Sequence, residues 1–163
     1  MNERRSHAAA AVINKKIYCC GGYNGRYLSS AECYDPHSDV WTQVCDMPQP
    51  SAGHAAVPVD GNLIVIGGQT GVEKYLSSMW VLDTKNKNGE WSDKPFMSHW
   101  RRNFGVAKMN NDILVCGGEF FYKTLDDVEM FDGKLWTNGP KLINPLWNVA
   151  TTVIPMNFAK HLK

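Results

Sequence analysis

The side chains that most often hold metals or act as nucleophiles are present here without the spacings that such chemistry needs. The histidines form no H-x-x-x-H pair, and none lies at a metal-ligand interval from a cysteine. They are His7, His37, His54, His99 and His161. The chain also lacks a G-x-x-x-x-G-K, a G-x-S-x-G and a dinucleotide-binding motif. We therefore expect no metal, no cofactor and no enzyme activity.

The five cysteines are an odd number without a C-x-x-C pair, and most lie inside apolar runs. Cys20 and Cys116 directly precede Gly-Gly pairs, and Ile66 stands at the same point of a third run. Because a thiol alternates there with isoleucine, this is a core position and not a nucleophile. Buried reduced thiols are typical of the cytosol and the nucleus, so we expect a cytoplasmic protein.

An acidic run, Asp126-Asp127-Val128-Glu129, is the one candidate for a carboxylate site. At the same repeat position two other segments read Ser29-Ser30-Ala31-Glu32 and Ser77-Ser78-Met79-Trp80. All three lie where the third strand of a repeat is expected to begin. We therefore interpret the acidic run as a solvated strand edge.

Binding chemistry is better represented, on three long loops that each follow a Gly-Gly pair. Tyr, Phe and Arg are frequent there, and these types form protein-binding hot spots because they combine large contact area with polar groups. The alternative is that the aromatic rings only pack each loop on its own sheet. The expected partner-binding residues are Tyr23, Asn24, Arg26 and Tyr27, then Gln69, Glu73, Lys74 and Tyr75, then Glu119, Phe121, Tyr122 and Lys123.

The charge and length exclude several kinds of partner. The 17 Lys plus Arg against 16 Asp plus Glu give a net charge of +1, which is no footprint for nucleic acid or an anionic membrane. The apolar runs are far shorter than the roughly 18 to 20 residues that cross a bilayer. A chain of 163 residues that is 44% hydrophobic is long enough for one globular core.

An internal repeat must position these loops. Gly-Gly pairs recur at intervals of 46 and 50 residues, and each ends an apolar run that reads as a strand covered on both faces. An Asp that suits a turn follows each pair, then a Trp that suits packing of one sheet on the next. The repeated residues are Gly21, Gly22, Asp35 and Trp41, then Gly67, Gly68, Asp83 and Trp91, then Gly117, Gly118, Asp132 and Trp136.

One repeat unit reads as four antiparallel strands in a meander, so the fold class is all-β. Gly-Gly, aromatic-Asp and Trp at these intervals resemble the kelch repeat, and the stretch from His7 to Gly25 is similar to the kelch-like adaptor subfamily, which combines BTB, BACK and kelch domains. The resemblance implies a partial kelch β-propeller with tandem four-stranded blades. We expect blades at 1–47, 48–97 and 98–142, and the first strand of an incomplete fourth blade at 143–163.

The second copy departs from the others. Leu82 precedes its Asp where the other copies have an aromatic residue, and eight residues separate Asp83 from Trp91 where the first copy has six. We expect a longer turn from Thr84 to Glu90 on the same fold.

The resemblance implies a protein-interaction module. Kelch-like adaptors recruit protein substrates to a cullin-based ubiquitin ligase, through BTB and BACK domains that this chain does not contain. Other kelch proteins bind actin or act as cytoskeletal scaffolds, and some kelch-like propellers are enzymes, but the loops here supply no repeated ligand set. The family often has arginine on the linker between blades, so Arg5 and Arg101 are candidates for contacting an acidic partner, with a salt bridge between blades as the alternative. Ser51 holds the same position in the second copy.

The repeat register also bears on assembly. Met1 lies at the position of Met47 and Met97, 20 residues before a Gly-Gly pair. Three blades cannot close a ring of about 4 to 8, and open blade faces expose apolar side chains. We expect either a part of a six-bladed ring or self-association of two copies through these open faces.

Overall fold

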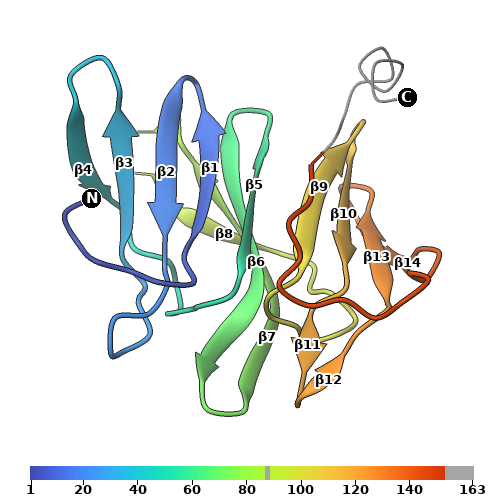
Figure 1. Ribbon diagram of the computed structural model, residues 1–163. Coiled ribbons are helices and arrows are strands. Elements are labelled where there is room, and N and C mark those ends of the chain that lie inside the picture. Colours follow the sequence, from blue (N-terminus) through green and yellow to red (C-terminus); the bar gives the residue numbers. More distant parts are fainter. Residues whose placement is uncertain (87–88, 153–163) are drawn as a thin grey trace, which may run out of the picture.

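The computed structural model describes residues 1–86 and 89–152, and this part of the chain is all-β (Figure 1). Three four-stranded antiparallel sheets follow one another along the chain. Within the described residues no helix is long and apolar enough to cross a bilayer. The strands of the first sheet are β1 (Ala9–Ile13), β2 (Lys16–Cys20), β3 (Ala31–Asp35) and β4 (Val40–Val44). Those of the second are β5 (Ala55–Val59), β6 (Asn62–Gly71), β7 (Lys74–Asp83) and β8 (Trp91–Lys94).

The third sheet contains β9 (Gly105–Met109), β10 (Asp112–Cys116), β13 (Val128–Phe131) and β14 (Trp136–Asn138). A separate hairpin of β11 (Glu119–Phe120) and β12 (Lys123–Thr124) is inserted between β10 and β13. In each sheet every strand pairs with its neighbour in the meander, which confirms the four-stranded antiparallel blade.

The blades stand side by side with their first strands innermost, since β5 contacts both β1 and β9 (Figure 1). One buried apolar cluster, which includes Ile13, Cys20 and Leu63, lies between the first and second blades. Another, which includes Ile66, Phe104 and Val115, lies between the second and third. Each blade therefore completes its core only against its neighbour, as the repeat predicts.

The Gly-Gly pairs allow the next linker to approach. Gly21 has a positive φ of 59°, and a Cβ there would lie 2.5 Å from the carbonyl oxygen of Ser51. The N–H of Gly22 donates to that same oxygen at 2.7 Å. Gly68 donates in the same way to Arg101, at 2.9 Å, and Gly118 to Leu146, at 2.7 Å. Any side chain at the first glycine would block this contact.

The Asp and Trp positions have the predicted roles. The Oδ1 atom of Asp35 accepts the N–H of His37 at 2.9 Å, and Asp83 and Asp132 form equivalent turns. The indole Nε1 of Trp91 donates to the carbonyl of Cys45 on the preceding blade at 3.1 Å. Trp136 does the same to Pro95 at 2.7 Å, so each of these rings is fixed against the neighbouring blade.

Arg5 and Arg101 are not surface residues, which corrects their assignment as partner contacts. Both guanidinium groups are fully buried. Arg101 donates to the carbonyl of Gly117 at 2.8 Å and to Glu129 Oε1 at 2.8 Å. Arg5 donates likewise to Gly21 O and to Glu32 Oε1, each at 2.7 Å. The alternative of a contact between blades is corrected as well, because the salt bridges and carbonyl contacts of both guanidinium groups lie within a single blade.

Glu129 is also corrected, because it is fully buried and does not lie on a solvated strand edge. It accepts the N–H groups of Ser98, at 2.7 Å, and of His99, at 3.2 Å, from the linker. Glu32 accepts Asn2 and Glu3 in the same arrangement. Burial alone would raise the pKa of Glu32, but these N–H groups and Arg5 hold it below its usual value.

The second blade replaces the whole network at once. Ser51 stands for the arginine and donates to the carbonyl of Gly67 at 3.1 Å. Trp80 stands for the glutamate, since it pairs with Val65 as Glu129 pairs with Val115. Pro48, which has no N–H, stands where Ser98 donates to Glu129. Without the cation the buried carboxylate would be uncompensated, so the three changes are physically coupled.

Two of the three long loops contain hairpins. The β6–β7 ladder continues past Gly68 to the pair Gly71 and Lys74, with register shifts beside Gly68 and after Gln69. The β11–β12 hairpin occupies the same place in the third blade. Backbone pairing in these hairpins satisfies polar groups that an irregular loop would leave to water. In the second blade's turn from Thr84 to Glu90, residues 87 and 88 lie outside the described residues.

The expected fourth blade is described only in part. Residues 143–152 contain no strand, and 153–163 lie outside the described residues. Thr151 nevertheless donates from Oγ1 to the carbonyl of Val106 at 2.5 Å, and the N–H of Val149 donates to Asn103 at 3.3 Å. The blade boundaries stay a prediction, because each linker bonds to the blades on both sides.

All five cysteines are free, and all but Cys45 are buried. Cys20 lies beside His54, whose Nε2 is 3.6 Å from its Sγ and 3.1 Å from its carbonyl oxygen. Burial raises the pKa of Cys20 to about 12 and lowers the pKa of His54 to about 4. Cys20 is therefore an inert core thiol, and His54 stays neutral in the folded chain.

His54 predicts acid sensitivity. Its folded pKa is about 4 and an unfolded histidine titrates near 6.5, so the unfolded chain binds the proton first and stability falls as the pH falls through this window. The loss between pH 7 and pH 4.5 is expected to be about 2 kcal/mol. Phe104 occupies the position of His54 in the next blade. His54→Phe should therefore remove the histidine's share of this loss of stability, as measured by urea unfolding at both pH values. His37→Phe is the exposed control, and an equal effect there would contradict the assignment.

The Arg101–Glu129 pair predicts a strong coupling. Arg101→Ser alone leaves Glu129 buried without its cation and is expected to cost about 3 to 5 kcal/mol. Adding Glu129→Trp reproduces the second blade's pair, so the second substitution should recover stability. A double-mutant cycle by urea unfolding measures this. Additive losses would show that the two positions are independent.

Candidate functional site

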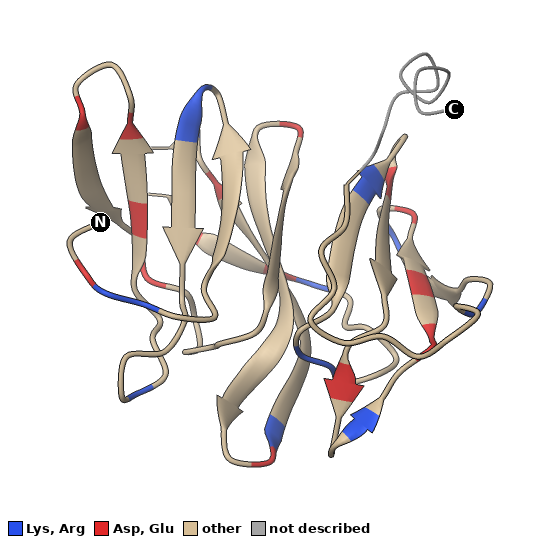
Figure 2. Cartoon of the chain, viewed as in Figure 1, with Lys and Arg blue, Asp and Glu red and all other residues tan. Residues whose placement is uncertain are grey.

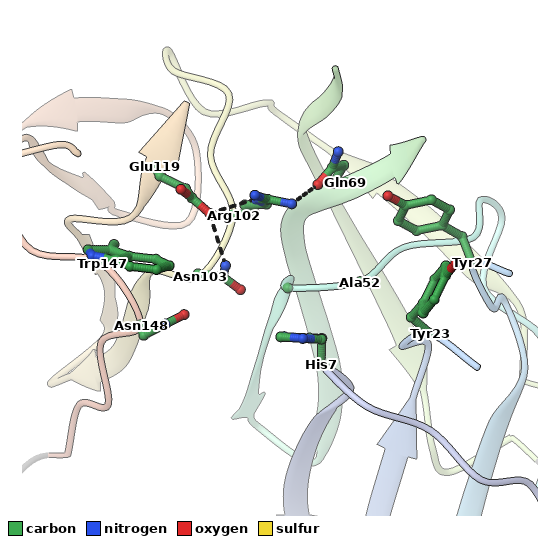
Figure 3. A pocket seen from close by; sticks show the side chains of 11 residues that line it. His7, Tyr23, Tyr27, Ala52, Gln69, Arg102, Asn103, Glu119, Trp147 and Asn148 are labelled. Atoms are coloured by element: carbon green, nitrogen blue, oxygen red, sulfur yellow. Dashed lines mark hydrogen bonds and ion pairs between the residues drawn. The ribbon is translucent and has the colours of Figure 1, made fainter. Parts of the chain in front are cut away.

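A cavity of about 310 Å³ lies where the linkers and the residues after the Gly-Gly pairs meet (Figure 3). In Figure 3, Tyr23 and Tyr27 form one wall, Trp147 and Asn148 form the opposite wall, and Arg102 lies between Glu119 and Gln69. All three blades contribute. The lining residues are His7, Tyr23, Tyr27, Ala52, Gly53, Gln69, Arg102, Asn103, Glu119, Trp147 and Asn148.

The lining follows the repeat. The first residue after each Gly-Gly pair forms a two-way backbone bridge with the linker residue next to Arg5, Ser51 or Arg101. Ala52 and Gln69, for example, each donate an N–H to the other's carbonyl at 2.9 Å. Ser6 with Tyr23 and Arg102 with Glu119 are bonded in the same way. The same backbone bridge between linker and loop therefore occurs three times around the cavity.

Left-handed residues turn each linker over the cavity. His7, Gly53, Asn103 and Asn148 share one position and have φ values of 51°, 65°, 54° and 53°. The N–H of Gly53 donates to the carbonyl of His7 at 2.8 Å, and Asn103 donates to Gly53 at 2.7 Å. These bonds connect successive blades beneath the cavity. Residues other than glycine are uncommon in this conformation, although asparagine and histidine tolerate it better than most.

The charged groups of the cavity neutralise each other. The Nε of Arg102 donates to Glu119 Oε1 at 2.7 Å, and Asn103 donates to the same oxygen at 3.1 Å. Arg102 also donates to the side-chain oxygen of Gln69. Its guanidinium lies 5.6 Å from the ring centre of Tyr75. The single cation is thus already paired, and the remaining surface is aromatic and amide.

Lys and Arg as well as Asp and Glu are scattered over all three blades in Figure 2. Among the described residues no group of three His, Cys, Asp or Glu side chains is placed to hold a metal ion. The acidic pair Asp126 and Asp127 lies 2.9 and 3.5 Å from the Lys141 ammonium group.

Four of the predicted binding residues line the cavity: Tyr23, Tyr27, Gln69 and Glu119. The others lie outside it. Asn24 and Arg26 are exposed near Glu3, at 3.1 and 4.0 Å from its carboxylate. Glu73, Lys74 and Lys123 are exposed on the hairpins.

Aromatic residues of the second and third loops and of the linker between these blades form a separate group, the aromatic ledge, which consists of Tyr75, Trp100, Phe120, Phe121 and Tyr122. Ring centres of Tyr75 lie 5.2 Å from Phe120 and 5.3 Å from Phe121. Because Tyr75 belongs to the second blade and both Phe residues to the third, these rings do not merely pack each loop on its own sheet.

Sequence reasoning missed His7, Arg102, Asn103, Trp147 and Asn148 in the cavity and Trp100 in the ledge. The signal was present for the cavity residues, because each lies one or two positions beyond the linker position of Arg5, Ser51, Arg101 or Leu146. The sequence did not show which of these linker side chains face the cavity.

Three consecutive four-stranded meanders, joined by linkers that bond to two blades each and share one cavity, define a β-propeller module. The chain belongs to the kelch family, because the kelch motif matches residues 4–48, 50–98 and 101–143. The solved structure of YjhT has the same fold, with a TM-score of 0.77 at 16% identity over 86% of this chain and 53% of that one.

Several relatives share the repeats. The chain is 31% identical over 171 residues to the human kelch repeat and BTB domain-containing protein 12, covering 91% of this chain and 27% of that protein. It is 30% identical over 149 residues to alpha-scruin of Limulus polyphemus, covering 84% and 16%. It is 33% identical over 96 residues to spermatocyte protein spe-26 of Caenorhabditis elegans, covering 58% and 16%. The chain thus spans about a sixth to a quarter of these relatives.

The left-handed position predicts an unusual response to glycine. At His7, where φ is 51°, glycine should be about 1 kcal/mol more stable than alanine, because only alanine is strained there. At His37, which has no positive φ, glycine should be no better than alanine. Urea unfolding of His7→Gly, His7→Ala and the two His37 variants checks this. The same order at both positions would argue against strain at the cavity.

Proposed function

We propose that this kelch module recruits a protein segment into the cavity shared by its blades. The observation that carries the proposal is the composition of the lining: exposed aromatic and amide side chains, in repeat register, around one internally paired Arg102–Glu119 couple. Aromatic groups with polar atoms give large contact area at low cost in conformational entropy. Kelch repeats imply protein partners, and the cavity offers a surface for one.

The finer role that we propose is substrate recognition for a cullin-based ubiquitin ligase. The human relative is by name a protein with both kelch repeats and a BTB domain. The kelch-like adaptors that this chain resembles act in this way, with ligase coupling supplied by BTB and BACK domains. The free buried thiols fit the reducing cytoplasm in which such adaptors act. Actin binding or scaffolding is the alternative role, and we propose binding, not catalysis, as the activity.

The polar network changes the expected partner. With Arg5 and Arg101 inside the blades and Arg102 paired to Glu119, the cavity offers no free cation from these three residues. The linker arginines had suggested a strongly acidic partner motif. Such a motif would find no unpaired arginine in the cavity and would face the Glu119 carboxylate. We therefore propose that the recruited segment is uncharged or weakly charged where it enters the cavity.

Tyr27 allows a direct test of the site. A photo-crosslinking phenylalanine derivative in place of Tyr27 is expected to capture a protein partner from a cytosolic extract. The same probe at Val40 is the control, because Val40 begins β4 opposite Asp35, at the far end of β3 from Tyr27, and does not line the cavity. Tyr27→Ala should then weaken binding of the identified partner about 10- to 30-fold, as loss of a hot-spot ring does.

Both the crosslinking result and the affinity result can contradict the proposal. Equal capture from both positions, or unchanged affinity of Tyr27→Ala, would remove the cavity as the binding site. Cosedimentation of the full chain with filamentous actin that Tyr27→Ala abolishes would favour the scaffold role over the adaptor role.

A further inference from the structure

The aromatic ledge is a second surface beside the cavity. Trp100 stacks on Phe120 with ring centres 5.7 Å apart, and Phe120 meets Phe121 edge-on at 4.6 Å. Much of the ledge faces water, since Trp100 is 52% exposed and Phe121 47% despite their ring contacts, and Tyr122 beside them is 78% exposed. An exposed aromatic cluster of this kind marks an interaction surface more often than a single exposed ring does.

The turn that presents the ledge is strained. Phe121 and Tyr122 are the two central residues between β11 and β12, with φ values of 45° and 62°. Such two-residue turns favour asparagine and glycine, because both central residues have positive φ. Two bulky aromatic residues are poor choices for this turn itself. Their presence is explained by what they display and not by the fold.

The ledge also carries unused hydrogen-bond donors. The indole N–H groups of Trp91 and Trp136 donate to main-chain carbonyls. The indole N–H of Trp100 and the hydroxyls of Tyr75 and Tyr122 have no hydrogen-bond partner within residues 1–86 and 89–152. An indole N–H can only donate. The ledge thus combines aromatic faces with donors that a ligand's acceptors can reach.

We propose that the ledge binds an extended, proline-containing segment of a partner protein. Such segments have no internal hydrogen bonds, so their carbonyl oxygens are free acceptors, and proline contributes no N–H that would require an acceptor. Proline-rich segments dock on aromatic-lined surfaces for this reason. Arg102 beside Tyr75 is already paired with Glu119, so this arginine offers no free charge to an acidic segment.

The ledge is continuous with the cavity. Arg102 lies over the ring of Tyr75 on one side and bonds to Glu119 and Gln69 on the other. A segment that crosses the ledge therefore leads towards the cavity lining. The proposal rests on the proposed function, since it names the class of segment that the module recruits.

The test uses the full chain and two labelled pools of ten-residue peptides with random flanks. One pool has a fixed Pro-x-x-Pro core and the other a fixed Ala-x-x-Ala core. By fluorescence anisotropy the proline pool should bind at least 10-fold more tightly. In NMR spectra it should shift the indole signal of Trp100, assigned with Trp100→Phe, and leave those of Trp91 and Trp136 in place.

The double variant Phe121→Asn/Tyr122→Gly separates a loss of binding from a loss of folding. It places the favoured residues in the turn, so its urea midpoint should rise while its affinity for the proline pool falls at least 10-fold. Leu135→Ala, which removes an exposed apolar side chain on another turn, should change neither.

Equal binding of the two pools, no binding of the proline pool, or full affinity in the double variant would each overturn the proposal. Failure of the proline pool together with capture of a partner at Tyr27 would reject the ligand class and leave recruitment by the cavity intact. Loss of the Tyr27 result with retention of proline binding would reject the cavity alone.

Discussion

The structure depends on a linker residue that bonds to two blades at once. The N–H of Arg101 donates to Leu76 and its carbonyl accepts Gly68, both in the second blade, while its guanidinium is buried in the third. Ser51 joins the first and second blades by the same geometry. This double attachment requires a residue without a side chain at Gly21 and Gly67, because the linker carbonyl occupies the space of a Cβ. The geometry that recurs in each repeat follows from this close approach of the linker carbonyl to the first glycine.

The same attachment also builds the cavity. Once the linker is bonded at Arg101, the next residues must pass over the inner end of the blades, where Arg102 bridges to Glu119 and Asn103 turns in the left-handed region. The cavity is thus a product of how the blades are joined. The side chains of the cavity can vary without disturbing the strands. Because the scaffold and the surface are separate, one fold can offer different chemistry to different ligands.

The buried ion pairs show how a repeat tolerates variation. Arg–Glu in the first and third blades and Ser–Trp in the second fill equivalent space, but neither arrangement accepts half of the other. A lone buried carboxylate would be unpaired, and the linker N–H that it accepts is absent at Pro48. The network joins residues 27 and 28 positions apart, so the coupling is hidden when each position is considered alone.

The sequence by itself determined the all-β class, the blade meander and the roles of Gly21, Asp35 and Trp91, because these depend on local backbone preference and on a repeated register. It also singled out Tyr23 and Gln69, which line the cavity. Only the tertiary structure decided that Arg101 points inward, that Arg102 pairs with Glu119 and that Trp100 joins Tyr75 and Phe121. The reason is physical: the sequence gives two adjacent arginines with no difference between them, and the backbone path of the linker decides that Arg101 is buried in the blade while Arg102 lines the cavity.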